Sequence, residues 1–418
     1  MNNIQGWDSK RLSDLIDGTF AGEWGDSAVG DKNDIPVLRS TNFTHSGIID
    51  YSNIVIRNIP EKKRIHKVLK KGDILLEKSG GSPSQPVGRV VYFESDTSFL
   101  YSNFTQKLTP SLSTDSKYLF YKMYFEYQNG LVLRYQQQTT GIINFQLSEY
   151  LNLKVEVPPL QEQKKIAVIL TSVDEVIEAC KAQINKLRDL KTGMMQDLLT
   201  KGIGHTEFKD SPVGKIPKKW DVKRLSDCCD VMTNGYVGPT RDIYKESGVP
   251  YVLCQNVRAN SFIEHTYKYV SVDFHKKNIR ACLQEGDVLT VQTGAGNGDS
   301  CVVPKSYAGA NCHALIISRT KKEILNPHFL SEYMNSDIGK NRVNIIATGG
   351  AHPHLNTTDL RVELIPIPPI DEQNKITELL SSIQIQYETI TRKVAAIEKT
   401  KKALMQDLLT GKVRVKLS

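Results

Sequence analysis

Several sequence patterns are missing from this chain of 418 residues, and each absence excludes a class of protein. No apolar run approaches the ~18 residues that a membrane-spanning helix needs. The opening stretch, MNNIQGWDSKRL, lacks the apolar core of a signal peptide, so we expect a cytoplasmic protein. The seven cysteines form no CxxC pair, which argues against a zinc site and against a disulfide framework.

Sequence signatures of catalysis are also missing. The chain contains no GxxxxGK[ST] loop, so the glycine-rich stretch 294–298 is interpreted as a tight turn. The tetrapeptide NPHF at 326–329 approaches an amino-methyltransferase motif, but no glycine-rich cofactor motif precedes it, and a capped helix start is the better interpretation. His352 and His354 have no third ligand at suitable spacing, so we expect no metal site. Because the signatures of catalysis are missing, we also expect no catalytic residues.

Length and charge leave several functions open. A chain this long exceeds one compact core and predicts two or three domains. Lysine and arginine outnumber aspartate and glutamate by 54 to 46, which gives a formal net charge of +8. That balance permits a nucleic acid as partner without requiring one.

The strongest positive feature is an internal repeat, the sign of a duplicated structural unit. The sequence MQDLLT occurs at 195–200 and again at 405–410. Pro36 aligns with Pro250 and Gly80 with Gly294 at an offset of 214, and residues 158–200 repeat at an offset of 210 without a gap. Val90-Val91 align with Val302-Val303. The chain is therefore two copies of one unit of roughly 210 residues.

The two copies differ unevenly along their length. The first ~150 residues of each copy share glycine, proline and apolar positions but few polar side chains, whereas the last ~45 share polar detail, as in PPLQEQKKI and PPIDEQNKI. One segment is thus predicted to hold a common partner twice, and the other to hold two different ligands.

The shared segments are predicted to form two long helices. Steps of three and four between apolar residues make a heptad seam. The seam consists of Ile166, Leu170, Val173, Ile177, Cys180, Ile184, Leu187, Met194 and Leu198 in the first copy, and of Ile376, Leu380, Ile383, Tyr387, Ile390, Val394, Ile397, Leu404 and Leu408 in the second. Lys191 and Lys401 fill the equivalent gap in each seam. A helix of about 40 residues with one apolar stripe needs a partner, and chain connectivity favours an antiparallel pair with a globular domain at each end. Two separate helices, each lying on its own domain, are the alternative.

The fold class that follows is α+β, with two pseudo-repeated mixed α/β domains separated by a long antiparallel two-helix coiled coil. The predicted domains are residues 1–155 and 206–365, and the predicted long helices lie in 156–205 and 366–418. Within the domains, patterning predicts strands at 37–43, 48–56, 251–257 and 262–270, a strand after each Gly-Asp pair (72–81 and 286–298), and helices at 117–127 and 327–336.

Asp73, Glu77 and Lys78 resemble a nuclease metal cluster. In the second copy the aligned residues are Asp287, Val291 and Gln292, so the pair of carboxylates is lost. A catalytic pair should not vanish from one copy if both copies work. The shared aspartate is therefore predicted to cap the turn beside its glycine.

The motifs that remain resemble those of a known family. Each copy has a globular part that opens with Gly6-Trp7 or with IPKKW (216–220), then a Gly-Asp strand with a glycine loop, then PPLQEQ or PPIDEQ leading into a long helix that ends MQDLLT. This order resembles the specificity subunit of type I restriction-modification systems along essentially the whole chain.

The resemblance implies a DNA-binding, non-catalytic subunit. Each variable region would be a target-recognition domain that reads one half of a bipartite, asymmetric site in double-stranded DNA. The helices would act as spacer and as platform for two modification (methyltransferase) subunits, and possibly for restriction (translocase-nuclease) subunits. S-adenosylmethionine, ATP and Mg would then belong to the partner subunits, and this chain would bind no cofactor.

Polar side chains on loops can read base edges, and they supply the predicted DNA contacts. In the first head these are Arg39, Lys78, Ser79, Ser82, Gln85, Arg89, Gln136, Gln137, Gln138, Thr139 and Thr140; in the second they are Gln255, Arg258, Gln292, Thr293, Asn297, His352 and His354. A solvated loop is the alternative for each of them. Glu162, Gln163, Glu372 and Gln373 are predicted to serve partner docking or the start of the helices.

Two other functions stay open at this point. A self-sufficient DNA methyltransferase would need a cofactor motif that the sequence lacks. A coiled-coil adaptor that binds only proteins would be favoured by acidic faces on both heads and opposed by basic ones.

Overall fold

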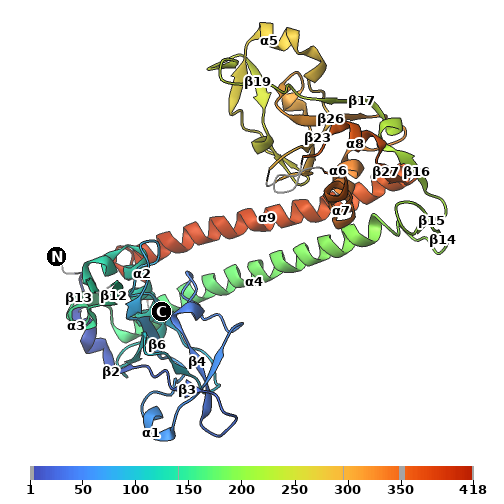
Figure 1. Cartoon of the computed structure of the whole chain (residues 1–418). Helices are drawn as coiled ribbons and strands as arrows, with labels where there is room; N and C mark the ends of the chain where they lie inside the picture. The colour runs from blue at the N-terminus through green and yellow to red at the C-terminus, as the bar shows by residue number, and fades with distance from the viewer. Residues whose placement is uncertain (1–3, 140, 295, 348–353, 417–418) are drawn as a thin grey trace. The chain divides into compact units, whose positions relative to one another are not determined.

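The computed structural model describes residues 4–139, 141–294, 296–347 and 354–416 (Figure 1). The chain divides into two compact units: the first is Met1–Lys181 with Arg392–Ser418, and the second is Ala182–Thr391. Each unit contains one mixed α/β head and one half of each of two long helices. We call residues 8–157 the first head and residues 221–367 the second head.

A four-stranded antiparallel sheet forms the centre of each head. In the first head its strands, in pairing order, are β2 (Ile16–Ala21), β10 (Thr105–Pro110), β6 (Ile74–Glu77) and β8 (Val90–Tyr92); in the second they are β17 (Cys229–Asn234), β26 (Leu315–Thr320), β23 (Val288–Val291) and β24 (Ser300–Val302). All four residues of β6 and of β23 are buried, as expected for strands covered on both faces. The identical strand order confirms the repeat that the sequence predicts.

Strand pairing corrects one detail of the repeat. Tyr92 lies opposite Ile74, and Val302 lies opposite Val288. Val302 is therefore equivalent to Tyr92, and the sequence alignment of Val90-Val91 with Val302-Val303 is wrong by two residues. A slip of two positions keeps every side chain on the same face of a strand, so the apolar pattern could not reveal it.

A second sheet in each head is built around one parallel pair. Its strands are β3 (Asp26–Ser27), β5 (Val55–Asn58), β4 (Asp34–Leu38) and β9 (Leu100–Tyr101) in the first head, and β18 (Tyr244–Lys245), β22 (Lys268–Val270), β19 (Val249–Val252) and β25 (Asn311–Cys312) in the second. The parallel pairs are β4 with β9 and β19 with β25.

The strands predicted at 37–43, 48–56, 251–257 and 262–270 are shorter than expected. Tight 3-10 turns, Ser40–Asn42 and Cys254–Asn256, interrupt them. The buried Asn42 side chain accepts from the Arg39 amide (2.9 Å) and donates to the Asp50 carbonyl (3.0 Å). Asn256 makes the equivalent contacts in the second head. One buried amide in each head therefore replaces strand pairing with a folded loop.

Short elements complete the heads. These are the strand pairs β1 (Asp8–Arg11) with β13 (Lys154–Val157), β16 (Asp221–Arg224) with β27 (Leu364–Ile367), and β20 (Val257–Arg258) with β21 (Ser261–Phe262), and the helices α1 (Glu61–Arg64), α3 (Leu147–Leu151), α5 (Val272–Lys277), α7 (Asp337–Ile346) and α8 (Thr357–Val362). The strand pair β14 (Phe208–Lys209) with β15 (Ile216–Pro217) lies in the segment before the second head.

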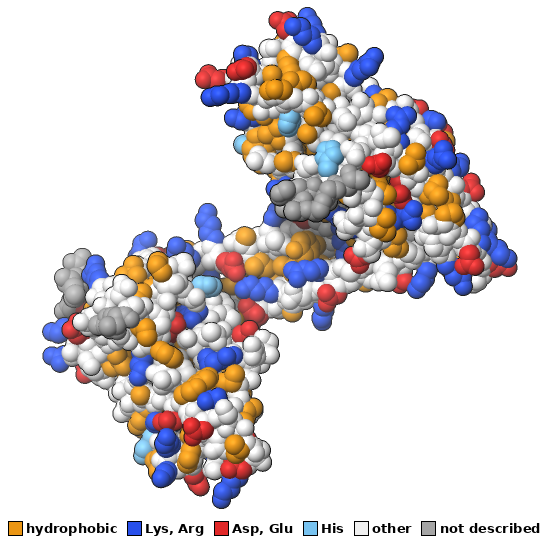
Figure 2. Space-filling model, in the orientation of Figure 1, with side chains coloured by type: hydrophobic (Ala, Val, Ile, Leu, Met, Phe, Trp, Pro, Cys, Tyr) orange, Lys and Arg blue, Asp and Glu red, His pale blue; other side chains and the backbone are white. Residues whose placement is uncertain are grey.

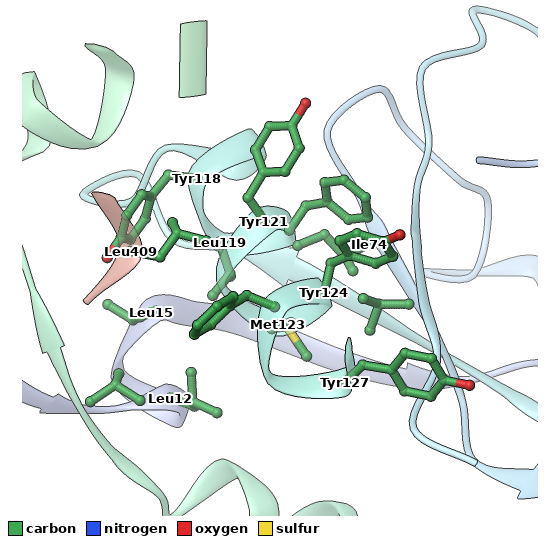
Figure 3. Packing of buried hydrophobic residues seen from close by; sticks show 14 of the residues in the cluster. Leu12, Leu15, Ile74, Tyr118, Leu119, Tyr121, Met123, Tyr124, Tyr127 and Leu409 are labelled. Carbon is green, nitrogen blue, oxygen red and sulfur yellow. The ribbon is translucent and has the colours of Figure 1, made fainter. Parts of the chain in front are cut away.

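One helix covers the central sheet in each head, close to the predicted bounds: α2 (Ser116–Gln128) and α6 (Pro327–Asn335). The Asp115 carboxylate caps α2 by accepting from the Tyr118 amide (2.9 Å). Asn326 caps α6 with proline in the first turn, which confirms that NPHF is a helix start. Figure 3 shows α2 side chains packed in the core of the first unit with Leu12, Leu15 and Leu409.

The long helices are α4 (Leu160–Leu198) and α9 (Ile370–Leu409), and each predicted seam position is buried or half-buried. In the first unit Lys401 Nζ lies 2.6 Å from Asp174 Oδ1. In the second unit Lys191 Nζ donates to Gln384 Oε1 (2.9 Å). Within each unit, a residue late in one helix meets a residue early in the other. The pairing is antiparallel, and the alternative of two separate helices is excluded.

None of the helices in the described part of the chain is both long and apolar enough to span a bilayer.

Candidate nucleic-acid interface

In the first head, a small sheet brings distant predicted contacts together. Its strands are β11 (Gln136–Thr139), β12 (Ile142–Phe145) and β7 (Ser79–Gly80). Asn144 lies opposite both Gln137 and Ser79, and Ser79 Oγ donates to Asn144 Oδ1 at 2.7 Å. Residues 65 positions apart in sequence thus meet on one surface. The sequence prediction missed Asn144, although it belongs to the same polar stretch as the predicted glutamines.

The exposed groups of this surface are amides and hydroxyls. Gln137 and Gln138 are exposed, whereas Gln136 donates to the Val87 carbonyl (3.3 Å). Ser82 and Gln85 close a tight turn through two backbone hydrogen bonds of 2.8 and 3.0 Å. Such side chains both donate and accept, which suits the edges of bases. Thr139 belongs to β11, and Thr140 lies outside the described residues.

Arg39 and Lys78 are half-buried beside this surface. The Arg39 guanidinium donates to the Asn53 carbonyl at 3.0 Å. The backbone amide of Lys78 donates to the Phe104 carbonyl at 2.9 Å. Burial, together with the positive charge of Lys67, lowers the pKa of the Lys78 amine. The Arg39 side chain and the Lys78 backbone are therefore both hydrogen-bonded within the first head.

Arg89 is set apart from the other predicted contacts because it is buried, with 4% of its surface exposed. Its guanidinium pairs with the Glu77 carboxylate (Nη2 to Oε2, 3.1 Å) and donates to the carbonyls of Phe43 (2.6 Å) and Ser40 (2.8 Å). Burial raises the pKa of Glu77, and the charge of Arg89 opposes that rise. In this structure Arg89 thus binds the protein's own backbone.

The second head repeats this arrangement with different side chains. Thr293 forms an isolated bridge with His354, and the Leu355 amide donates to the Gln292 carbonyl at 2.9 Å. Thr293 and His354 are exposed, but Gln292 is buried and its side-chain amide donates to Asn234 Oδ1 (3.1 Å). The sequence prediction missed Asn234, which no motif marks. His352 lies outside the described residues.

The other predicted contacts of the second head lie on separate turns. Gln255 and Arg258 are exposed at the turn that leads into the β20–β21 hairpin, which packs against β24. The Asn297 amide donates to the Gly294 carbonyl at 3.0 Å, which confirms a tight turn in this glycine-rich stretch. The structure thus places Gln292, Thr293 and His354 together, and Gln255 and Arg258 in a second group.

Each predicted docking residue makes a contact inside its own unit. Glu162 accepts from Trp7 Nε1 (3.3 Å) and from the Arg414 guanidinium (2.8 Å), and both the Gln163 and Glu162 side chains are buried. Gln163 Oε1 accepts from the Asp115 amide at 2.9 Å. These contacts hold the start of α4 against the first head.

The second unit makes equivalent contacts, with a histidine in place of the arginine. Glu372 accepts from Trp220 Nε1 (3.1 Å), and its Oε1 lies 2.9 Å from His205 Nε2. Gln373 Oε1 accepts from the Asn326 amide at 2.8 Å. The sequence had left partner docking and the start of the helices as alternatives for Glu162, Gln163, Glu372 and Gln373, and these contacts serve the start of the helices. Trp7 and Trp220 occupy equivalent places in the repeat, so the sequence alone could have marked them as partners of these glutamates.

The shared aspartates close turns as the sequence predicts. Asp73 Oδ2 accepts from the Lys70 amide (2.8 Å), and Asp287 Oδ2 accepts from the Gln284 amide (2.7 Å). Each turn contains the glycine before the aspartate. No group of three or more His, Cys, Asp or Glu residues in the described ranges could hold a metal ion.

Charge alone does not mark a DNA-binding face in the view of Figure 2. Lysine and arginine side chains are interspersed with aspartate and glutamate over both heads on the face shown. The distinguishing feature of the candidate surface is therefore its cluster of amide, hydroxyl and imidazole groups, not a continuous field of one sign.

The fold and these surfaces define a class of protein: a duplicated chain with two variable heads on a paired-helix frame. The profile of the type I restriction modification DNA specificity domain matches residues 4–189 and again residues 217–399. The chain belongs to this family.

Characterised relatives extend over most of the chain. It is 31% identical over 308 residues to the type I restriction enzyme MjaVIII specificity subunit of Methanocaldococcus jannaschii, a match that covers 72% of this chain and 71% of the relative. It is 27% identical over 416 residues to the putative type I restriction enzyme MjaX specificity subunit of the same organism, a match that covers 98% of this chain and 94% of the relative. The EcoKI specificity subunit of Escherichia coli (strain K12) is 22% identical over 387 residues, covering 86% and 77%.

Solved structures share the fold at lower identity. The S subunit of a type I restriction-modification system from M. genitalium superposes with a TM-score of 0.60 at 15% identity, covering 100% of this chain and 98% of that one. A chain from a structural study of type I R-M complex assembly and conformational transition gives a TM-score of 0.57 at 16% identity, covering 99% and 100%.

Proposed function

We propose that this chain is the DNA-specificity subunit of a type I restriction-modification complex and that each head reads one half of a bipartite, asymmetric target. The observation that carries the proposal is the pairing of a constant frame with unlike reading groups. Ser79 and Asn144 in the first head occupy the positions of Thr293 and His354 in the second. Ser79 and Thr293 both carry a hydroxyl, whereas the Asn144 amide and the His354 imidazole differ in their donors and acceptors. A different donor and acceptor set at an equivalent position selects a different base.

The remaining polar surface of each head supports this reading. Gln137, Gln138 and the Ser82–Gln85 turn extend the first surface, and Gln255 with Arg258 forms a second exposed group in the other head. We propose these exposed residues as the first to test for base contact. Arg89 and Gln292, which are buried, are proposed to act through their neighbours.

The modification subunits are proposed to dock on the repeated helical frame, two to a chain, because the duplicated frame offers one binding surface twice. Restriction subunits would join through them. Chemistry and cofactors are assigned to these partners: the described residues form no cluster that could hold a metal, and the sequence lacks the cofactor and phosphate-binding motifs of such enzymes.

Methylation sequencing tests the proposal. Cells that carry this chain together with its modification subunits should show one bipartite methylated sequence with two unlike halves, and cells that lack this chain should lose that methylation. Calorimetry of the isolated chain with S-adenosylmethionine should show no binding. Tight binding, or methyl transfer by the chain alone, would instead identify a self-sufficient methyltransferase, and a complex without DNA affinity would identify a protein-only adaptor.

A further inference from the structure

We propose that Arg89 and Glu77 form an internal brace that sets the separation of two recognition segments in the first head, residues 40–45 and the turn 82–85. Arg89 is then a positioning residue for base readout and not a base contact. This inference rests on the proposed function, since it concerns how one head holds its reading groups.

The brace connects segments that are distant in sequence. Arg89 Nη1 and Nη2 donate to the carbonyls of Phe43 (2.6 Å) and Ser40 (2.8 Å), which lie 46 and 49 residues away. Arg89 Nε donates to Glu77 Oε2 at 3.2 Å. The guanidinium also lies 5.6 Å from the centre of the Phe43 ring. One rigid, planar group therefore fixes the 40–45 segment to the central sheet.

The same pair underlies a polar cleft of about 430 Å³. Ser40, Thr41 and His45 line it from one segment, and Ser82 and Gln85 line it from the other. The Gln85 amide lies beside the guanidinium and, with its oxygen turned inward, accepts from Arg89 Nη2 at 3.1 Å. Both walls of the cleft thus depend on the position of Arg89.

Stability alone does not account for a buried ion pair. Removing two charges from water costs about as much as their attraction returns, and apolar replacements of similar volume are often neutral or stabilising. The geometry explains the pair better. Beyond Asn42, the 44–48 loop is closed by its own hydrogen bonds from the Thr44 amide and hydroxyl to the Ile48 carbonyl (2.9 and 2.8 Å). Tyr124 on α2 also donates to the His45 carbonyl (3.0 Å). None of these bonds joins the loop to the 82–85 turn, as the Arg89 contacts do.

The second head is braced differently. Val90 lies opposite Leu76 and Ser300 lies opposite Thr290, so Asp299 takes the place of Arg89. The Asp299 carboxylate forms an ion pair with Lys340 on α7. The position of Glu77 is taken by Val291. Disrupting the Arg89 brace should consequently affect one half of the target only.

The test is the double substitution Arg89→Met with Glu77→Leu in the full chain, assembled with its modification subunits. It removes both charges together and keeps the core filled, but the Phe43 and Ser40 carbonyls lose their donor. The variant should therefore fold and melt somewhat below the wild type, which a melting curve checks first. Methylation of a DNA library randomised in both half-sites then measures base discrimination at every position. We expect discrimination in one half-site to fall by about tenfold, the value of one good base contact, and the other half-site to be unchanged. Hydrogen exchange of the 40–45 amides should accelerate.

Arg57→Met is the matched control. Arg57 also lies in the first head and donates to two carbonyls, those of Trp24 (3.2 Å) and Gly25 (3.0 Å), but it belongs to β5 in the other sheet. It should leave both half-sites unchanged. Arg89→Lys keeps the positive charge but loses the planar guanidinium that donates to two carbonyls. It should give a smaller loss of base discrimination in the same half-site. If the double variant fails to fold, this single variant decides.

Unchanged discrimination in the folded variants, or an equal loss in both half-sites, would overturn the brace. If the wild-type complex showed no sequence preference at all, the proposed function would be overturned instead. The two failures are therefore distinguishable in one experiment.

Discussion

The two units use the same carboxylate at the start of each long helix and complete its contacts with different side chains. Glu162 binds the Trp7 indole and Arg414, from the C-terminal segment, whereas Glu372 binds the Trp220 indole and His205, from the segment between the repeats. The frame keeps its geometry and accepts either an arginine or a histidine beside the carboxylate. In the heads, the backbone pairing is kept while the side chains differ, as with Asn144 in the first head and His354 in the second.

The comparison of the two units shows which residues are the same in both copies of the repeat. The buried glutamine after each carboxylate is identical, and so are its contacts with the cap of α2 or α6. Arg89, by contrast, has Asp299 in its place. The glutamic acid, glutamine and tryptophan at the start of each long helix are therefore repeated, and the contacts of Arg89 are not.

The largest effect that would sharpen the comparison is expected from the buried glutamines. Gln373→Leu leaves the Asn326 amide and the Pro368 and Ile324 carbonyls without their partner. Each unpaired buried group costs about 1–3 kcal/mol, so we expect a loss of about 3–5 kcal/mol in the free energy of unfolding of the second unit. Denaturation followed by tryptophan fluorescence measures it, because Trp220 lies at this junction.

Gln163→Leu should cost less, about 2–4 kcal/mol, since Gln163 bonds only to the Asp115 amide and the Pro158 carbonyl. Gln161→Leu, exposed in the first turn of α4, is the control and should be nearly neutral. Equal and small effects at all three positions would show that these amides do not hold the junctions.

An intermediate effect is expected from the seam lysines, which interrupt the two apolar stripes at equivalent positions. Lys401 binds Asp174 and lies over the rings of Tyr121 and Tyr124 at 5.6 and 5.2 Å. Lys401→Met removes the ion pair and both cation–π contacts, so we expect a loss of about 1–3 kcal/mol, measured by calorimetric melting.

Lys191→Met removes a hydrogen bond to a neutral amide, that of Gln384, and adds apolar surface to the seam. We expect a change within about 0.5 kcal/mol. If Lys191→Met lowered the free energy of unfolding more than Lys401→Met, the proposed difference between the two lysine contacts would be contradicted.

The smallest effect concerns pH. Tyr121 and Glu332 occupy the same place in their helices, each six residues after the cap. Burial raises the pKa of Glu332, partly opposed by Lys191, so the folded state favours the neutral acid. Its contribution to stability is present below its ordinary pKa and is lost as the pH rises through the raised value. Glu332→Gln should therefore stabilise the second unit at pH 7 and have little effect near pH 4.

Glu162 should respond in the opposite direction. Burial would raise its pKa, but Arg414 and Trp7 outweigh burial and lower it. Ionised Glu162 therefore stabilises the first unit at neutral pH, and this contribution is lost as the pH falls through the lowered pKa. Arg414→Gln should flatten the acid side of the unfolding profile of that unit. If Glu332→Gln and Arg414→Gln changed the pH dependence of stability in the same direction, the opposite pKa shifts assigned to Glu332 and Glu162 would be contradicted.

Periodic features of the chain, including the pairing of the two long helices, were predictable, and the side-chain contacts between distant loops were not. The seams from Ile166 to Leu198 and from Ile376 to Leu408 predict two helices that the structure contains, because a helix face repeats every three or four residues. The strands after Gly72 and Gly286 and the caps Asn326 and Asp73 follow from equally local rules. The strand expected through residues 37–43 fails at Asn42, whose partners are eight and eleven residues away.

The candidate site was predictable in composition and not in geometry. Ser79, Gln137 and Thr293 have the polar character that base readout needs. The structure places Ser79 and Gln137 on one small sheet of the first head and Thr293 in an isolated bridge of the second. Arg89 satisfies the same criterion, yet it is buried by Glu77 and by carbonyls more than 40 residues distant. Its pairing depends on the packed loops, which no local pattern encodes.

A head replacement tests the division between constant frame and variable reader most directly. In the altered chain, residues 7–157 replace residues 220–367, so that both junctions keep their tryptophan and their glutamic acid–glutamine pair. Methylation sequencing with the modification subunits should then return the same half-site twice. Persistence of the original target with two unlike halves would contradict the assignment of one half-site to each head.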